Sequence, residues 1–165
     1  MIGLGGADLF NVTIAGNASN VDHSGSDGAG AGVSVAAGAP LNFSNSIIAN
    51  NFHYTDGLFS VLNDCAGTIN SQGYNIVTHP TCTVAGAFST EAMQFGLLQY
   101  NGGPTRTLSL LAGSGGIDAG NPAGCSDDLG ALDVDQRGLP RPVGAACDLG
   151  AYEVQDLIFQ DGFDA

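Results

Sequence analysis

Lysine and tryptophan are absent from this chain, and arginine occurs only three times, at Arg106, Arg137 and Arg141. Because there are 16 acidic residues, the formal net charge at pH 7 is -13. A chain without a basic patch cannot displace the counterions of a nucleic acid, so we expect no nucleic-acid partner. The charge also disfavours polyanionic substrates and anionic membrane surfaces, whereas divalent cations would complement it.

Long apolar runs are missing as well. No stretch is long enough for a transmembrane helix, and residues 1–6 lack the charged and apolar regions of a signal peptide. Charged residues make up only 12% of the chain, which argues against helices with salt-bridged surfaces. The 26 glycines and the short valine and isoleucine runs are typical of an all-β protein rich in turns. A length of 165 residues predicts one domain.

One motif occurs twice, 34 residues apart. Residues 11–17, Asn-Val-Thr-Ile-Ala-Gly-Asn, return as residues 45–51, Asn-Ser-Ile-Ile-Ala-Asn-Asn. Each copy is a short β-favouring run closed by an asparagine, which tolerates left-handed turn geometry. Such a repeat predicts the coils of a β-solenoid, in which each unit buries its apolar face by stacking on the next. We expect Asn11, Asn17, Asn45 and Asn51 to be structural, with an exposed binding ladder as the alternative.

Further short strands are expected along the chain, three to a coil, as in a parallel β-helix. They are residues 33–35, 41–43, 46–48, 68–69, 74–77, 107–111 and 150–154. Residues 17–32 and 50–63 are expected to be loops, the second carrying Phe52, Tyr54 and Phe59. Residues 88–100 predict a single helix, capped by Ser89 or Thr90, and a strand with a loop is the alternative.

Four cysteines fall into two local groups, Cys65 with Cys82 and Cys125 with Cys147. Three pairings are possible, and closing the two local loops is the preferred one. The spacing does not resemble a zinc site. An even number of widely spaced cysteines favours an oxidising compartment.

From residue 101 the sequence contains motifs that are specific enough to compare with a known family. Four motifs follow one another in order: Asn-Gly-Gly-Pro-Thr at 101–105, Ile-Asp-Ala-Gly at 117–120, Asp-Gln-Arg-Gly at 135–138, and Cys-Asp-Leu-Gly-Ala-Tyr-Glu at 147–153. This order resembles the C-terminal end of bacterial exported right-handed parallel β-helix proteins, the surface group with choice-of-anchor and polymorphic-outer-membrane-like repeats. Residues 158–163, Ile-Phe-Gln-Asp-Gly-Phe, are similar to the C-terminal tails of secreted proteins of such bacteria.

The resemblance implies a short right-handed parallel β-helix with an irregular, disulfide-linked C-terminal cap. We divide the chain into β-helix coils with long loops at 1–100, a Gly- and Asp-rich cap at 101–154, and an apolar tail at 155–165. Family members are usually longer and exported, so we expect this chain to be the end of a longer secreted or cell-surface protein. Because the family has no single activity, the resemblance implies fold and export more than function.

Acidic residues concentrate near the C-terminus, where ten of the sixteen lie from Asp118 onward. Residues 133–138, Asp-Val-Asp-Gln-Arg-Gly, have the spacing of the first half of a calcium loop, but the closing glutamate of an EF-hand is replaced by Gly144. The sequence therefore predicts an irregular Ca²⁺ site, with Asp127, Asp128, Asp133, Asp135 and Asp148 as ligands. The alternative is that Asp135, Arg137 and Arg141 form ion pairs that hold the cap together.

Enzyme motifs are scarce. There is no Gly-x-Ser-x-Gly elbow and no di-zinc histidine motif, and His23, His53 and His79 are expected to be isolated surface residues. The coils carry few carboxylates for a glycosidase, and a polyuronate lyase would need basic residues that are not available.

The leading prediction is a calcium-binding C-terminal module of an exported bacterial surface protein, used for adhesion or anchoring. Its cell-surface or small-molecule ligand is unknown. The alternative is a calcium-dependent hydrolase of small esters or lactones, and with less support of a polysaccharide. Exposed solenoid ends or the apolar tail would favour a homo-oligomer.

Overall fold

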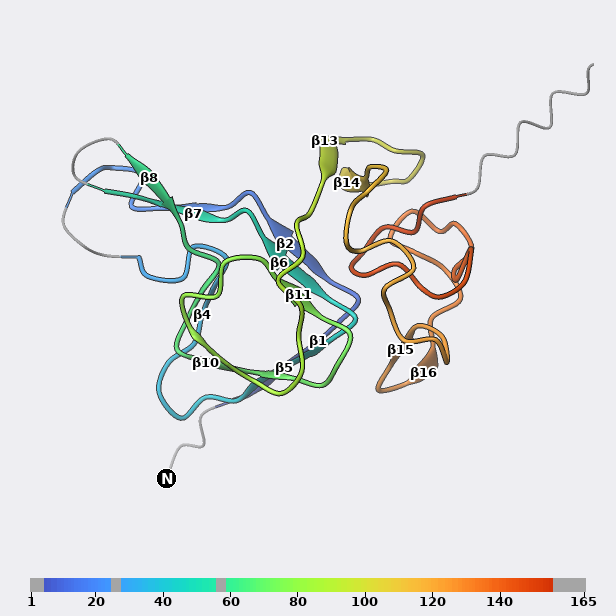
Figure 1. Cartoon of the computed structure of the whole chain (residues 1–165), viewed down its shortest axis with the longest axis horizontal. Coiled ribbons are helices and arrows are strands. Elements are labelled where there is room, and N and C mark those ends of the chain that lie inside the picture. Colours follow the sequence, from blue (N-terminus) through green and yellow to red (C-terminus); the bar gives the residue numbers. More distant parts are fainter. Residues whose placement is uncertain (1–4, 25–27, 56–58, 156–165) are drawn as a thin grey trace, which may run out of the picture.

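The computed structural model describes residues 5–24, 28–55 and 59–155. Within these residues the chain is all-β, with many short strands and no helix, and most strand pairs are parallel (Figure 1). The strands are β1 (Ala7–Phe10), β2 (Thr13–Ala15), β3 (Ala18–Ser19), β4 (Val33–Ser34), β5 (Leu41–Ser44), β6 (Ile47–Ala49), β7 (Phe52–Tyr54), β8 (Ser60–Leu62), β9 (Cys65–Ala66), β10 (Thr68–Ser71), β11 (Ile76–Val77), β12 (Thr83–Ala85), β13 (Phe95–Gln99), β14 (Thr107–Leu110), β15 (Ser126–Asp127) and β16 (Gly130–Ala131).

Successive passes of the chain form stacked layers. Layer 1 contains β1 to β4, layer 2 contains β5 to β9, and layer 3 begins at β10. Three parallel sheets connect the layers, with strand orders β1-β5-β10-β12, β11-β6-β2 and β4-β9. The 34-residue repeat sets the register between layers 1 and 2, because Ile14 pairs with Ile48.

The β-branched runs of the repeat alternate between two apolar cores. Ile48, Val77 and Phe43 point into the interior of the stack, where Cys65 and Ile69 are also buried. Ile47, Ala49 and Ile76 point outward and belong to a second core. Both faces of the sheet β11-β6-β2, the central sheet, are therefore covered. This explains why residues 47–49 are apolar without interruption.

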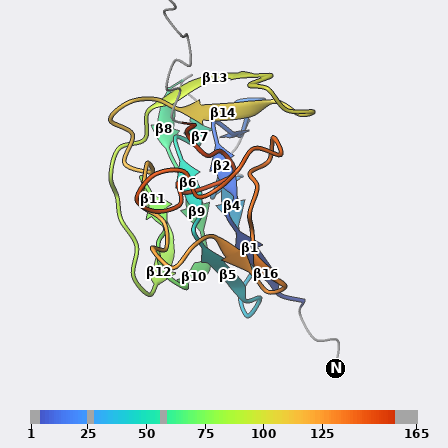
Figure 2. The same cartoon turned by 90° about the vertical axis from the view of Figure 1, so that its right-hand side faces the viewer.

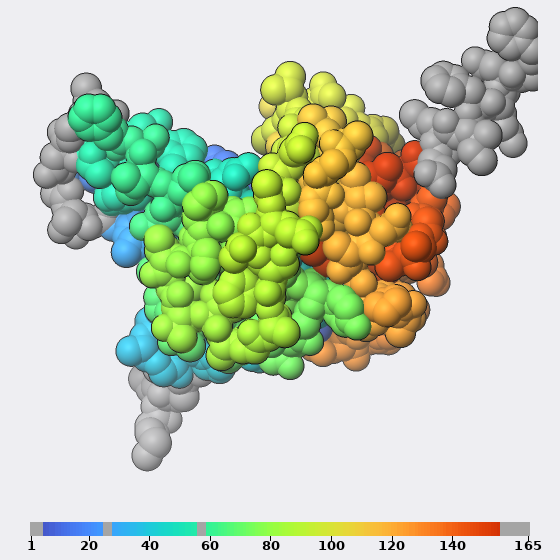
Figure 3. Space-filling view, viewed as in Figure 1, coloured from blue at the N-terminus to red at the C-terminus, as the bar shows by residue number. Residues whose placement is uncertain are grey.

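The second core is completed by the C-terminal segment, residues 90–155. Met93, Leu110 and Leu149 pack against the outward side chains of the central sheet. In the space-filling view this segment, coloured yellow-green through orange to red, lies beside the layers rather than across one end of the stack (Figure 3). The expected cap is thus a flanking segment.

Close contact between the flanking segment and layer 1 depends on Gly150. Its φ is +82°, and a Cβ at this position would collide with Oγ1 of Thr13. The Gly150 N–H donates to the carbonyl of Asn45, and the Ala151 N–H donates to Thr13 Oγ1. A residue with a side chain would separate the two parts.

Three expected elements differ from the structure. Residues 88–100 form no helix: residues 95–99 are strand β13, which pairs antiparallel with β14 as a hairpin, so the alternative of a strand with a loop is the one found. Residues 150–154 form no strand, because their N–H groups bond to side chains and to the carbonyl of Asn45 instead of to a neighbouring strand. The expected loop at 50–63 also contains strands β7 and β8.

The preferred cysteine pairing is confirmed. Disulfides join Cys65 to Cys82 and Cys125 to Cys147, with Cα atoms 5.2 and 5.8 Å apart. The first links layers 2 and 3, and the second lies within the flanking segment. Among the residues described, no helix is long and apolar enough to cross a membrane. The tail at 156–165 lies outside the described residues.

Candidate functional site

The five aspartates predicted to bind calcium do not share one environment. Asp135 and Asp148 are buried, Asp127 is half-buried, and Asp128 and Asp133 are exposed. Asp127 accepts the N–H groups of Leu129 and Gly130 and so closes its own turn between β15 and β16.

Asp135 is the centre of a buried hydrogen-bond network. One carboxylate oxygen accepts the backbone N–H groups of Arg137 and Leu139, at 2.8 and 3.2 Å. The other accepts the guanidinium of Arg137 at 2.7 Å and the N–H of Glu153 at 3.0 Å. Although burial by itself raises the pKa of Asp135, these hydrogen bonds hold that pKa below its usual value.

The second buried ion pair joins Arg141 and Glu153, whose Nε and Oε2 atoms lie 3.3 Å apart. The same guanidinium donates to the carbonyls of Asp148 and Gly150. Glu153 in turn accepts the N–H groups of Val143 and Asp148, at 2.7 and 3.0 Å. This pair therefore holds three separate stretches of irregular backbone together.

Burial dominates the protonation of this pair and of Asp148. It raises the pKa of Glu153 above its usual value despite two backbone hydrogen bonds, and it lowers the pKa of Arg141. It likewise raises the pKa of Asp148, whose oxygens accept the N–H groups of Asp118 and Val154. These carboxylates act as acceptors for buried backbone donors, which would otherwise destabilise the segment.

The network does not fit a calcium site. Both oxygens of Asp135 and of Asp148 are already bonded to N–H donors, and Arg137 occupies the position from which a cation would approach Asp135. Within the described ranges no three acidic, histidine or cysteine side chains gather in a way that could hold a metal ion. Calcium binding at these aspartates stays a prediction without support from the contacts.

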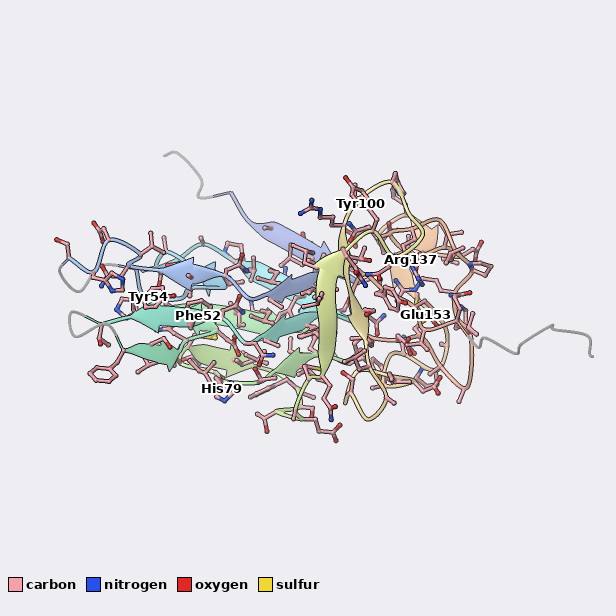
Figure 4. The ribbon with its side chains drawn as sticks, turned by 90° about the horizontal axis from the view of Figure 1, so that it is seen from above. Phe52, Tyr54, His79, Tyr100, Arg137 and Glu153 are labelled. Carbon is pink, nitrogen blue, oxygen red and sulfur yellow. A yellow bond between two sulfur atoms is a disulfide. The ribbon has the colours of Figure 1, made fainter. Side chains whose placement is uncertain are left out.

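A second candidate site is the lobe formed by β3, β7 and β8. β3 pairs parallel with β7, and β7 pairs antiparallel with β8. The lobe projects from the layers on the side away from the flanking segment, at upper left in Figure 1. In Figure 4, Phe52 and Tyr54 lie at one end of the molecule, and Arg137 and Glu153 lie at the other.

Aromatic side chains form the interior of the lobe. Tyr54 contacts Phe52 edge-to-face at 5.2 Å and His23 at 4.7 Å. His23 and His53 are half-buried here, unlike the exposed His79, so the surface role expected for the histidines holds fully only for His79. Phe59, Val61 and Leu62 are exposed, with Phe59 75% accessible. Val61 and Leu62 are successive residues of β8, so they point to opposite faces of the sheet.

One contact in the lobe bears on the hydrolase alternative. Ser19 Oγ lies 3.1 Å from His53 Nδ1. In the part of the chain that the structure describes, no carboxylate bonds to His53, so the pair lacks the acid that orients the base in a Ser-His-Asp triad. The contact is therefore explained as a cross-strand pair between β3 and β7.

No protein-family model matches the chain. Comparison with curated proteins and with solved structures gives no match either. The fold and the candidate sites define a class: an all-β protein of short parallel strands with two disulfides. Such disulfides are typical of proteins outside the reducing cytoplasm.

Proposed function

We propose that the chain is an adhesion or anchoring module of an exported bacterial surface protein, built on a short right-handed parallel β-helix. Parallel layers in a 34-residue register support the β-helix. Connections between parallel strands of one sheet are right-handed in about 98% of cases, which supports the handedness. The two disulfides fit an exported protein.

The observation that carries the adhesive role is the exposed side of the lobe. Phe59, Val61 and Leu62 are large apolar side chains on β8 or immediately before it, and β8 is the edge of the three-stranded sheet. Large exposed apolar side chains next to a free strand edge are typical of interaction sites. The buried network of the flanking segment has a different role, since its charged groups bond to one another and to the backbone. Among the residues that the structure describes, no contact favours the hydrolase alternative.

The proposal is tested by retention of the fluorescently labelled chain on methyl-terminated and hydroxyl-terminated monolayers and on bacterial cells. We expect retention on the methyl-terminated surface and on cells, and a loss of about tenfold in the double variant Phe59→Asp/Leu62→Asp, because two apolar contacts are removed.

The matched control is Leu111→Asp/Leu129→Asp, which adds the same charge at two exposed leucines outside the lobe. This variant should be retained like the parent chain, and circular dichroism should show that both variants are folded. Equal retention of the two variants would rule out the lobe as the adhesive surface.

A further inference from the structure

The β13–β14 hairpin crosses the stacked layers instead of following them. Phe95, at the start of β13, packs against the outer core, which contains Ile47 and Ala49 of layer 2 and Ile76 of layer 3. Leu98 lies three residues further along and lines a groove with Thr13 and Ala15 of layer 1. Tyr100 follows immediately after β13, and Figure 4 shows it at the β1 side of the stack. The hairpin therefore extends past layer 2 along layer 1 toward the free side.

The free end of the hairpin carries exposed apolar side chains, and Arg106 lies over the ring of Tyr100, 5.6 Å from its centre. Leu97 is 79% exposed, Leu98 58% and Tyr100 66%. The groove between the hairpin and β2 has a volume of about 370 Å³, and Leu108 and Tyr152 also line it. Toward layer 2 the corresponding surface of the hairpin is filled by Ile47 and Ala49. The hairpin thus presents a contact surface for one layer more than the structure contains.

Among the described residues, the layer-1 edge has backbone groups that no neighbouring strand pairs. β2 is the last strand in the order β11-β6-β2. In a parallel strand, alternate residues direct their N–H and C=O groups to opposite sides. The carbonyls of Val12 and Ile14 bond toward layer 2, so the main-chain groups of Thr13 and Ala15 face the free side. Figure 2 shows β1 at the same outer side of the stack.

Asparagine side chains of successive layers form a hydrogen-bonded ladder that ends at the same edge of layer 1. Asn51 Oδ1 accepts both the N–H and the side-chain amide of Asn17, at 3.0 and 2.9 Å. Asn17 is the equivalent residue of layer 1, and its own exposed Oδ1 accepts no hydrogen bond from the described residues. Asn11 Oδ1 is buried and likewise has no partner, whereas Oδ1 of the equivalent Asn45 accepts the N–H of Asn121.

We propose that the layer-1 edge and the free end of the β13–β14 hairpin together form a docking surface for one further parallel β-coil. The coil would carry an asparagine in register with Asn17, which donates to Asn17 Oδ1. Its outward residues would be small or apolar, and they would fill the groove beside Leu98 and cover the exposed Tyr100 outside it. The hairpin then acts as a brace across three successive layers. This proposal depends on the β-helix architecture of the proposed function, and it does not depend on adhesion by the lobe.

The test adds one layer at this edge. A second copy of residues 7–40 is inserted between Gly6 and Ala7, so that the 34-residue register is kept. We expect the thermal midpoint to rise by about 4–8 °C, because solenoid stability is largely a sum of contacts between neighbouring repeats. Amide exchange of the original Thr13 and Ala15 should slow by about tenfold or more, since both N–H groups become paired.

The matched control places Leu98→Asp and Tyr100→Asp in both the extended and the original chain. These substitutions should remove about half of the gain in the extended chain and change the original chain by less than about 1 °C. An extended chain that fails to fold or gains no stability overturns the proposal. It is also overturned if the original chain forms dimers that the two substitutions dissolve, because the occupant is then a second copy. The retention of the lobe variants on surfaces is a separate measurement. Failure of the proposed adhesive role can therefore be distinguished from failure of the docking surface.

Discussion

At the residue scale, the acidic side chains near the C-terminus have structural roles that depend on burial. Asp133 and Asp135 are two positions apart in one motif, yet Asp133 is exposed and Asp135 accepts hydrogen bonds from three residues in the interior. Both fit the spacing of a calcium loop, so the motif alone does not separate a metal ligand from a backbone acceptor. The ion-pair alternative for Asp135, Arg137 and Arg141 describes the contacts correctly, with Glu153 as the partner of Arg141.

Asp135→Asn should lower the free energy of unfolding at pH 7 by about 3–5 kcal/mol, because it leaves the buried guanidinium of Arg137 without its partner. Folding lowers the pKa of Asp135 below its ordinary value of 3.8. The contribution of its carboxylate to stability is therefore fully present above pH 3.8 and is lost as the pH falls through the folded-state pKa. Urea unfolding at pH 7, 5 and 3 should therefore show a difference between parent and variant that shrinks at the lowest pH. Asp133→Asn is the matched control, and an equal loss in both variants would contradict the assignment.

At the scale of single elements, the layers depend on side chains that bond along the stack. Asn51 is fully buried; its carboxamide accepts from Asn17, donates to the carbonyl of Ile14 and donates to Asp64. Asp64 also accepts the Thr78 hydroxyl and the His79 N–H, so it joins layers 2 and 3. The prediction that these asparagines are structural is confirmed for Asn17 and Asn51. Left-handed backbone occurs at Asn11 and Asn45, at the start of each motif copy, and at Gly16 and Asn50, one residue before each closing asparagine.

Asn51→Ala should lower the free energy of unfolding by about 2–4 kcal/mol, because it leaves several buried polar groups without partners. Asn17→Ala, at the exposed end of the same ladder, should cost only about 1 kcal/mol. Chemical denaturation of both variants measures the difference. If the two substitutions cost the same, the ladder is not the source of layer stability.

At the scale of the whole molecule, two different interiors lie on opposite faces of one sheet. The inner core lies within the stacked layers, and the outer core attaches residues 90–155 to their side. The aromatic lobe and the buried ion pairs lie at opposite ends (Figure 4). A partner bound at the lobe would therefore leave the flanking segment free to support the layers.

The contacts lead us to expect that neither millimolar calcium nor EDTA shifts the thermal midpoint by more than about 1 °C, since the buried aspartates already bond to N–H donors. Scanning calorimetry of the full chain with and without each additive measures this. A rise with calcium that Asp133→Asn or Asp128→Asn removes would establish a site at the exposed aspartates instead.

Local sequence was sufficient for the strands of the repeat, the β class and the cysteine pairing. The run of Thr13 and Ile14, and its copy at Ile47 and Ile48, favours strands by itself, and its spacing sets the register between layers. The tertiary structure decided the rest. Residues 95–99 are a strand because β14 is available to pair with them, and residues 150–154 are irregular because buried side chains and the Asn45 carbonyl accept their N–H groups. Whether a carboxylate binds an ion, an arginine or the backbone depends on which groups distant segments bring to it, and no local pattern contains that information.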